Sequence, residues 1–275
     1  MRLFLASFLL SLVSVLAFAQ GTPAQPPPII GYDSRFQPVP SREGMVVSSD
    51  AIASRVGARI LAEGGNAVDA AVATGFALAV TYPQAGNVGG GGFMLLHLAK
   101  EKRQVAIDYR ETAPRAATRD MFLDAKGEVV EERSQLTHLA SGVPGTVAGL
   151  LHAQEGYGRL PRAKVMAPAI AIAREGFPVG YAMSALLSGP WGQRLLANEA
   201  ARGYLFKPDG SPYEPGELLR QPDLAWTLEQ IAERGVEGFY AGPVADRLVA
   251  EMKRGSGLID HEDLRRYRAI EREPV

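Results

Sequence analysis

The stretch SSDAIASRVGARILAEGGNAVDAAVATGFALAV, residues 48–80, decides the fold because it predicts two consecutive helices, the second of them buried. The first helix follows residues 48–50, Ser-Ser-Asp, which are side chains that commonly cap helix N-termini. Ile52, Val56 and Ile60 recur every four residues and form one apolar helix face. We therefore expect this helix to pack its apolar face against a core.

A pair of glycines separates the two predicted helices. Gly64-Gly65 favours a left-handed C-terminal cap, and Asn66 can cap the helix that follows. That second helix runs from Ala67 to about Val80 and is apolar nearly all round, with Asp69 as its single charge. Such a helix is typical of the middle of a fold.

The segments on either side of these helices predict strands. Residues 45–47, Met-Val-Val, predict a short strand before the first helix. Four glycines at 89–92 precede a strand expected at 93–99, and a charged turn at 100–103 leads to a second strand at 104–109, so the two form a hairpin. We expect the glycines to pack the strand start tightly beside the buried helix. They lack the patterns of nucleotide-binding loops.

The second half of the chain predicts mostly helices. They are expected at residues 146–154, 162–175, 223–234 and 243–254. The stretch 182–197 also has helical character, but Gly189-Pro190 is expected to break it in two. A last helix begins at His261 with Asp260 as its cap, and we expect no closing element after it. Together the elements predict an α/β fold (α+β).

Composition excludes several classes of protein. The 275 residues carry a formal net charge of -1, which gives no basic surplus for nucleic acid. The absence of cysteine excludes disulfides and thiolate chemistry. The four histidines show no zinc-ligand spacing, so we expect no metal site among them. They are His97, His138, His152 and His261.

The N-terminus predicts export. Arg2 precedes an apolar run from Leu3 to Leu16, and residues 17–19, Ala-Phe-Ala, form a cleavage site after Ala19. A membrane anchor is the alternative, but a run of 14 residues is short of the roughly 20 that span a bilayer. We expect a signal peptide at 1–19, a Pro-rich leader at 20–43, a periplasmic or secreted location, and no membrane association after cleavage.

Arg110 is the candidate site residue. It ends the second predicted strand, where Val105 and Ile107 share one face and Asp108 and Arg110 the other. An arginine at a strand end can present a planar fork to a carboxylate and make two parallel hydrogen bonds. It can also form a structural ion pair with Asp108, and the residues alone favour this second interpretation.

Ordered motifs across residues 44–275 resemble the large subunit of the γ-glutamyltransferases, also called glutathione hydrolases. They are GMVVSS at 44–49, GGNAVDAAVA at 64–73, GGGGFM at 89–94, DYRETAP at 108–114, GVPGTVAG at 142–149, APAIA at 167–171, REGFP at 174–178, GFYAG at 238–242 and DLRRY at 263–267. Each motif alone is weak, but their order and spacing together identify the chain with this family.

The resemblance implies an N-terminal nucleophile hydrolase fold with αββα layers, and a precursor that cuts itself into a large and a small subunit. The new N-terminal threonine of the small subunit is then the nucleophile, and its α-amine is the base. The γ-glutamyl group, usually from glutathione, passes to water or to an amino-acid or peptide acceptor without a cofactor. Arg110 falls on the family arginine that grips the donor's α-carboxylate, with Asp108 orienting it, so the resemblance reverses the preference for a structural pair.

The chain also departs from the family pattern. Thr112, Thr137 and Thr146 do not stand in a processing motif, and residues 85–88 replace a common serine-glycine pair. We expect the domain at 44–275 to be truncated at its C-terminal end, to leave apolar surface exposed, and to be inactive alone because the nucleophile lies beyond residue 275. The alternatives are an inert truncated or split homologue, a poly-γ-glutamate depolymerase and a cephalosporin acylase.

Overall fold

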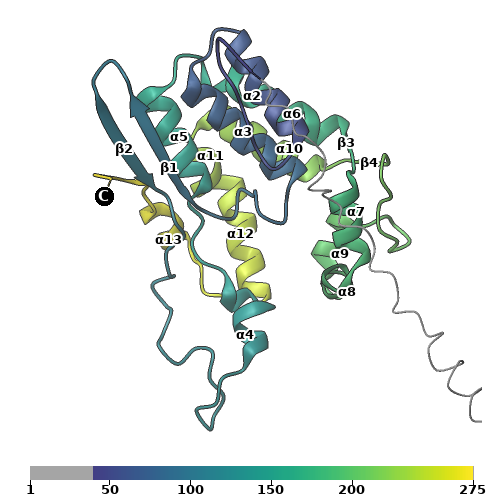
Figure 1. Ribbon diagram of the computed structural model, residues 1–275. Helices are drawn as coiled ribbons and strands as arrows, with labels where there is room; N and C mark the ends of the chain where they lie inside the picture. The colour runs from purple at the N-terminus through teal and green to yellow at the C-terminus, as the bar shows by residue number, and fades with distance from the viewer. Residues whose placement is uncertain (1–39, 275) are drawn as a thin grey trace, which may run out of the picture. The chain divides into compact units, whose positions relative to one another are not determined.

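The computed structural model describes residues 40–274 (Figure 1). The expected signal peptide at 1–19 and most of the leader at 20–43 lie outside the described residues. The chain divides into two units, residues 1–42 and 43–275, and every described helix and strand belongs to the second. None of the described helices is both long and apolar enough to cross a bilayer.

The two helices predicted from residues 48–80 are confirmed as α2 (Ala51–Ala62) and α3 (Ala67–Thr81). Asp50 caps α2 by accepting the N–H groups of Ile52 and Ala53 at 2.9 Å. Gly64 has φ 92°, the left-handed conformation that glycine adopts without strain, so the chain can turn between the helices. Asn66 and Asp69 form a capping box at the start of α3, and α3 is buried on nearly all sides.

Asp69 is fully buried, and its carboxylate organises the start of α3. It accepts the N–H of Asn66 at 2.9 Å, that of Arg159 at 2.9 Å and that of Leu160 at 3.3 Å. A Cβ on Gly158 would lie 2.6 Å from its Oδ1, so only glycine fits there. A residue 90 positions away in sequence is thereby fastened to the cap of the central helix.

The predicted hairpin is confirmed as β1 (Phe93–Leu98) and β2 (Arg103–Asp108), which pair antiparallel with Phe93 opposite Asp108. A third strand, β5 (Ile270–Arg272), pairs with the other edge of β2. The prediction of no closing element after the last helix was wrong. Three residues, Ile-Glu-Arg, carry too little periodicity to predict a strand, and only the free edge of β2 makes them one.

The strand predicted at residues 45–47 was also wrong. This segment has no regular secondary structure and no ladder partner among the described residues. Met45 and Val47 are exposed, whereas Val46 packs against the core. A short apolar run favours a strand, but a strand forms only where a neighbour supplies hydrogen bonds.

The helical second half is confirmed. Its predicted helices are α5 (Thr146–Tyr157), α6 (Arg162–Glu175), α7 (Tyr181–Ser188), α8 (Pro190–Leu196), α10 (Pro222–Arg234), α12 (Gly242–Arg254) and α13 (His261–Arg266). Gly189-Pro190 separates α7 from α8, as predicted. Short elements that the sequence did not predict are α4 (Glu131–Gln135), η1 (His138–Ala140), β3 (Phe177–Pro178), α9 (Glu199–Leu205), β4 (Leu218–Leu219) and α11 (Glu237–Tyr240).

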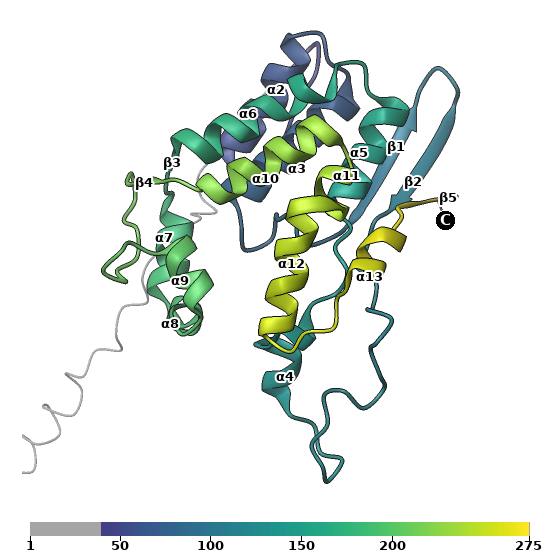
Figure 2. The ribbon, with the colours of Figure 1, turned by 180° about the vertical axis from the view of Figure 1, so that it is seen from behind.

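The sheet and the helices form two layers, which Figure 2 shows with the hairpin at the edge of the helix cluster. Val105 and Ile107 are buried on the face of β2 that packs against the helices. On the opposite face Phe93 and Leu95 are 65% and 67% exposed, and Ile270 is also exposed. The described residues thus supply one helical layer and the three-stranded sheet β1-β2-β5 of the predicted αββα arrangement, with an uncovered apolar sheet face, as expected from the sequence, while β3 and β4 pair separately as a two-stranded sheet.

A contact between distant elements fastens the long segment after β2. The imidazole Nε2 of His138 in η1 lies 2.7 Å from Oε1 of Glu251 in α12. Arg254 also donates from Nε to Glu251 at 2.7 Å. The hydrogen bonds from Arg254 and then from His138 lower the pKa of Glu251 to about 2.

We expect Asp69→Ala to lower the free energy of unfolding by about 3 kcal/mol or more, because it removes a fully buried carboxylate and leaves the N–H groups of Asn66, Arg159 and Leu160 without this acceptor. Urea unfolding followed by circular dichroism measures this change. Asp223→Ala is the matched control, since Asp223 is an exposed aspartate in the first turn of α10, and it should cost less than about 1 kcal/mol. Equal losses for the two variants would contradict the role given to Asp69.

Glu251→Gln should destabilise the protein at pH 7 and cease to do so in acid. A carboxylate whose pKa is lower in the folded than in the unfolded protein stabilises the folded state at pH values above its unfolded pKa. That stabilisation is lost as the pH falls toward the folded pKa. Because Glu251 is well exposed, we expect at most about 1 kcal/mol. Unfolding of both proteins should show the difference shrinking from about pH 4.5 toward 2. A difference that stays constant over this range would refute the linkage.

Candidate functional site

Arg110 lies two residues after the end of β2, and its backbone is fixed while its side chain is open. Its N–H donates to Oδ1 of Asp108 at 3.0 Å, and its carbonyl accepts from the hydroxyl of Tyr267 at 2.8 Å. The side chain is 70% exposed, and its Nε lies 3.4 Å from Oε2 of Glu111. The structure therefore holds the main chain on both sides and leaves the guanidinium facing solvent.

Asp108 does not form the side-chain pair with Arg110 that the residues alone favoured. Its Oδ2 accepts from Nε of Arg272 in β5 at 2.8 Å. Ile270 is the register partner of Asp108, so Arg272 is the diagonal neighbour on the same face. The backbone N–H of Arg110, and next the side chain of Arg272, lower the pKa of Asp108. Asp108 thus contacts the backbone of Arg110, and Arg272 is the pairing residue that the sequence did not reveal.

The glycine run packs around the base of Arg110. The carbonyl of Gly90 accepts the N–H groups of Gly145 and Thr146 at 2.7 and 2.9 Å, where α5 begins. A Cβ on Gly91 would lie 2.5 Å from the carbonyl oxygen of Tyr109. The expectation of tight packing at the strand start is confirmed, but the neighbours are Tyr109 and the start of α5 instead of the buried helix α3.

Two stacked tyrosines complete the frame behind Arg110. The rings of Tyr240 and Tyr267 lie nearly parallel, with centroids 5.8 Å apart. Tyr240 donates its hydroxyl to the carbonyl of Pro144 at 2.8 Å, beside the close approach at Gly145. Burial raises the pKa of both hydroxyls, that of Tyr267 to about 12, so both remain protonated donors at neutral pH.

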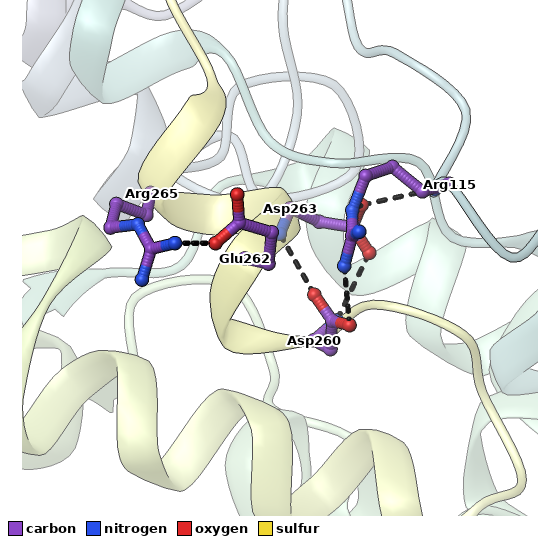
Figure 3. Close-up of polar contacts among 5 residues, drawn as sticks. All are labelled: Arg115, Asp260, Glu262, Asp263 and Arg265. Atoms are coloured by element: carbon purple, nitrogen blue, oxygen red, sulfur yellow. Dashed lines mark hydrogen bonds and ion pairs between the residues drawn. The ribbon is translucent and has the colours of Figure 1, made fainter.

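A cluster of charged side chains joins the segment after Arg110 to α13 (Figure 3). Arg115 donates its backbone N–H and its Nε to Oδ1 of Asp263, at 3.0 and 3.1 Å, and its Nη2 to Oδ2 of Asp260 at 2.8 Å. Asp260 and Asp263 also form the capping box of α13, and Glu262 pairs with Arg265 on the outer side. Asp260 is the predicted cap of α13, but nothing in the sequence indicates that Arg115 lies against it.

The remaining candidates have structural surroundings. His138, His152 and His261 each lie near one carboxylate, those of Glu251, Glu271 and Asp246, and His97 is on the exposed face of β1. Within residues 40–274 no group of three or more histidine, aspartate or glutamate side chains could hold a metal ion. The threonines are internal to the chain: Thr112 bridges to Val143, Thr137 caps η1 and Thr146 begins α5.

Sequence comparisons match this chain to known proteins over most of its length. The sequence model of the family described as Gamma-glutamyltranspeptidase matches residues 53–275. The glutathione hydrolase proenzyme of Escherichia coli is 49% identical over 258 residues, which are 94% of this chain and 44% of that protein. That of Pseudomonas sp. strain A14 is 48% identical over 86% of this chain and 41% of its own length. The chain therefore spans less than half the length of these relatives.

Solved structures extend the similarity to the fold. The gamma-glutamyltranspeptidase of Helicobacter pylori is 44% identical, with a TM-score of 0.84 over 87% of this chain and 68% of that chain. A cephalosporin acylase from Bacillus halodurans is 29% identical, with a TM-score of 0.71 over 90% of this chain and 47% of that one. The predicted mixed helix-and-sheet fold of N-terminal nucleophile hydrolase type is confirmed, and the chain belongs to the gamma-glutamyltranspeptidase family.

Proposed function

We propose that this chain binds the γ-glutamyl donor of a glutathione hydrolase or γ-glutamyltransferase, and that Arg110 grips the donor's α-carboxylate. The observation that carries the proposal is the contrast at Arg110: both backbone polar groups are bonded, and the guanidinium is 70% exposed. A fixed main chain with an open planar fork suits bidentate recognition of a carboxylate.

The contact between Arg110 and Glu111 is compatible with carboxylate binding by Arg110. Nε of Arg110 lies 3.4 Å from Oε2 of Glu111, a longer distance than the roughly 2.7–2.9 Å of a strong charge-assisted hydrogen bond. An exposed pair of this kind contributes little to stability, so an incoming carboxylate can compete for the guanidinium. Glu111 lies beside the guanidinium of Arg110 without neutralising it in a buried bridge.

The reaction is acyl transfer with a nucleophile supplied by sequence other than these 275 residues. The γ-glutamyl group of glutathione or a related donor passes to an N-terminal threonine of a small subunit, then to water or to an amino-acid or peptide acceptor. Two observations support a partner of this kind. The chain spans 44% of its Escherichia coli relative, and the sheet face with Phe93 and Leu95 is apolar and exposed.

A related acylase is the second candidate. The Acylase ACY 1 proenzyme of Pseudomonas sp. strain V22 is 37% identical over 92% of this chain, and one similar structure is a cephalosporin acylase. Three bacterial glutathione hydrolase proenzymes at 46–49% identity favour the first candidate. We place the protein in the periplasm or outside the cell, on the basis of residues 1–19.

Arg110→Ala in the longer protein, with the small-subunit sequence present, should raise the KM for γ-glutamyl-p-nitroanilide by about 10- to 150-fold. This range corresponds to the roughly 1.5–3 kcal/mol of charged hydrogen bonds. Arg103→Ala is the control, because Arg103 lies at the opposite end of β2 and is also exposed. Steady-state kinetics should show an unchanged KM for the control. An unchanged KM for Arg110→Ala would return Arg110 to a structural role.

The purified 275-residue chain should show no hydrolysis of γ-glutamyl-p-nitroanilide, because it lacks the proposed nucleophile. Release of p-nitroaniline, followed by absorbance, measures this directly, and the longer protein is the positive control. Turnover by the chain alone that survives further purification would show that the nucleophile lies within these residues.

A further inference from the structure

We propose that Tyr267 is a positioning residue for Arg110, so that helix α13 sets where the donor's carboxylate is held. The inference rests on the proposed function of Arg110 and adds to it a second residue, 157 positions away in sequence. Tyr267 follows α13 directly as its C-cap residue. It touches the backbone of Arg110 and leaves the guanidinium free, so it acts on the substrate only through Arg110.

The hydroxyl of Tyr267 has one defined position. Tyr267 is only 7% exposed, and its ring lies nearly parallel to that of Tyr240, at an angle of 4° between the ring planes. Tyr240 is itself anchored by its bond to the carbonyl of Pro144. The 2.8 Å hydrogen bond to Arg110 is therefore made by a group that packing holds rigid.

Gly145 supports this arrangement from the other side. A Cβ at this residue would lie 2.2 Å from the hydroxyl oxygen of Tyr267 and 2.0 Å from the carbonyl oxygen of Tyr109. No side chain fits between them, so the start of α5, the end of β2 and the end of α13 meet at one point. Arg110 is the next residue after that point, and the meeting of three elements fixes where its Cα stands.

The Arg115 cluster holds α13 in place for this task (Figure 3). Asp263 is only 5% exposed and accepts both the N–H and the Nε of Arg115. The segment from Arg110 to Arg115 is thus tied to α13 at both ends, once through Tyr267 and once through Asp263. A shift of α13 would move the carbonyl of Arg110 and, with it, the reach of the guanidinium.

The direct test is Tyr267→Phe in the longer protein that contains the small-subunit sequence. The variant keeps the stacked ring and deletes one hydroxyl. We expect the KM for γ-glutamyl-p-nitroanilide to rise about 3- to 10-fold while kcat changes less than about twofold, as the loss of one neutral hydrogen bond implies. An unchanged KM in a folded Tyr267→Phe protein would overturn the proposal.

The matched control is Tyr204→Phe. Tyr204 in α9 donates its hydroxyl to Gln221, and burial raises its pKa to about 12, as it does for Tyr267. Both variants should lose similar stability in thermal melts, but only Tyr267→Phe should raise the KM. A rise of equal size in both would show a general structural effect and would refute positioning.

A double-mutant cycle separates this inference from the proposed function. In an Arg110→Ala background, Tyr267→Phe should change kcat/KM by less than about twofold, because the group that it positions is absent. The same loss in both backgrounds would refute action through Arg110. If Arg110→Ala leaves the KM unchanged, the proposed function of Arg110 fails. If Arg110→Ala raises the KM but Tyr267→Phe leaves it unchanged, only the inference about Tyr267 fails.

Should Tyr267→Phe not fold, Arg115→Ala replaces it, with the same expected rise in KM and the same refuting result.

Discussion

The buried carboxylate of Asp69 is the constraint on which the rest of the structure depends. It caps the central helix α3 and binds the backbone after α5, so two helices distant in sequence share one polar anchor. Thr81 at the other end of α3 donates to Asp50, which caps α2. A helix without a polar face has no preferred orientation in an apolar core, and these end contacts supply one. Removing the Asp69 carboxylate would leave the N–H groups of Asn66, Arg159 and Leu160 without this acceptor.

A series of contacts connects Asp69, through α5, to the exposed residue Arg110. The far end of α5 is fixed near Asp69, and its start lies against Gly90 and Tyr109. The main chain therefore reaches Arg110 from a rigid base, and Tyr267 holds it from a third element. Because the main chain of Arg110 is already ordered, binding a carboxylate costs only the entropy of ordering the exposed side chain. The same layering leaves one apolar sheet face uncovered, with Phe93 and Leu95 upon it.

The features that were predictable from sequence are local ones. The caps at Asp50, Asn66 and Asp260, and the break at Gly189-Pro190, depend on neighbours a few residues away, and all were confirmed. The errors concern partners distant in sequence: the strand β5, the missing strand at 45–47 and the pairing of Asp108 with Arg272. Arg115 and Tyr267 belong to the same class, because nothing in residues 108–116 indicates that α13 lies against them. The role of Arg110 came from family motifs and stays a prediction.

Recognition of the donor's α-carboxylate by Arg110 is the central claim, and substrate discrimination tests it most directly. The quantity to measure is the ratio of kcat/KM for γ-glutamyl-p-nitroanilide to that for its analogue with the α-carboxylate converted to an amide. The account predicts a ratio of about 10 or more in the wild-type protein that contains the small-subunit sequence, and a ratio near one in Arg110→Ala. The same large ratio in both proteins would contradict it, because the carboxylate would then be recognised elsewhere.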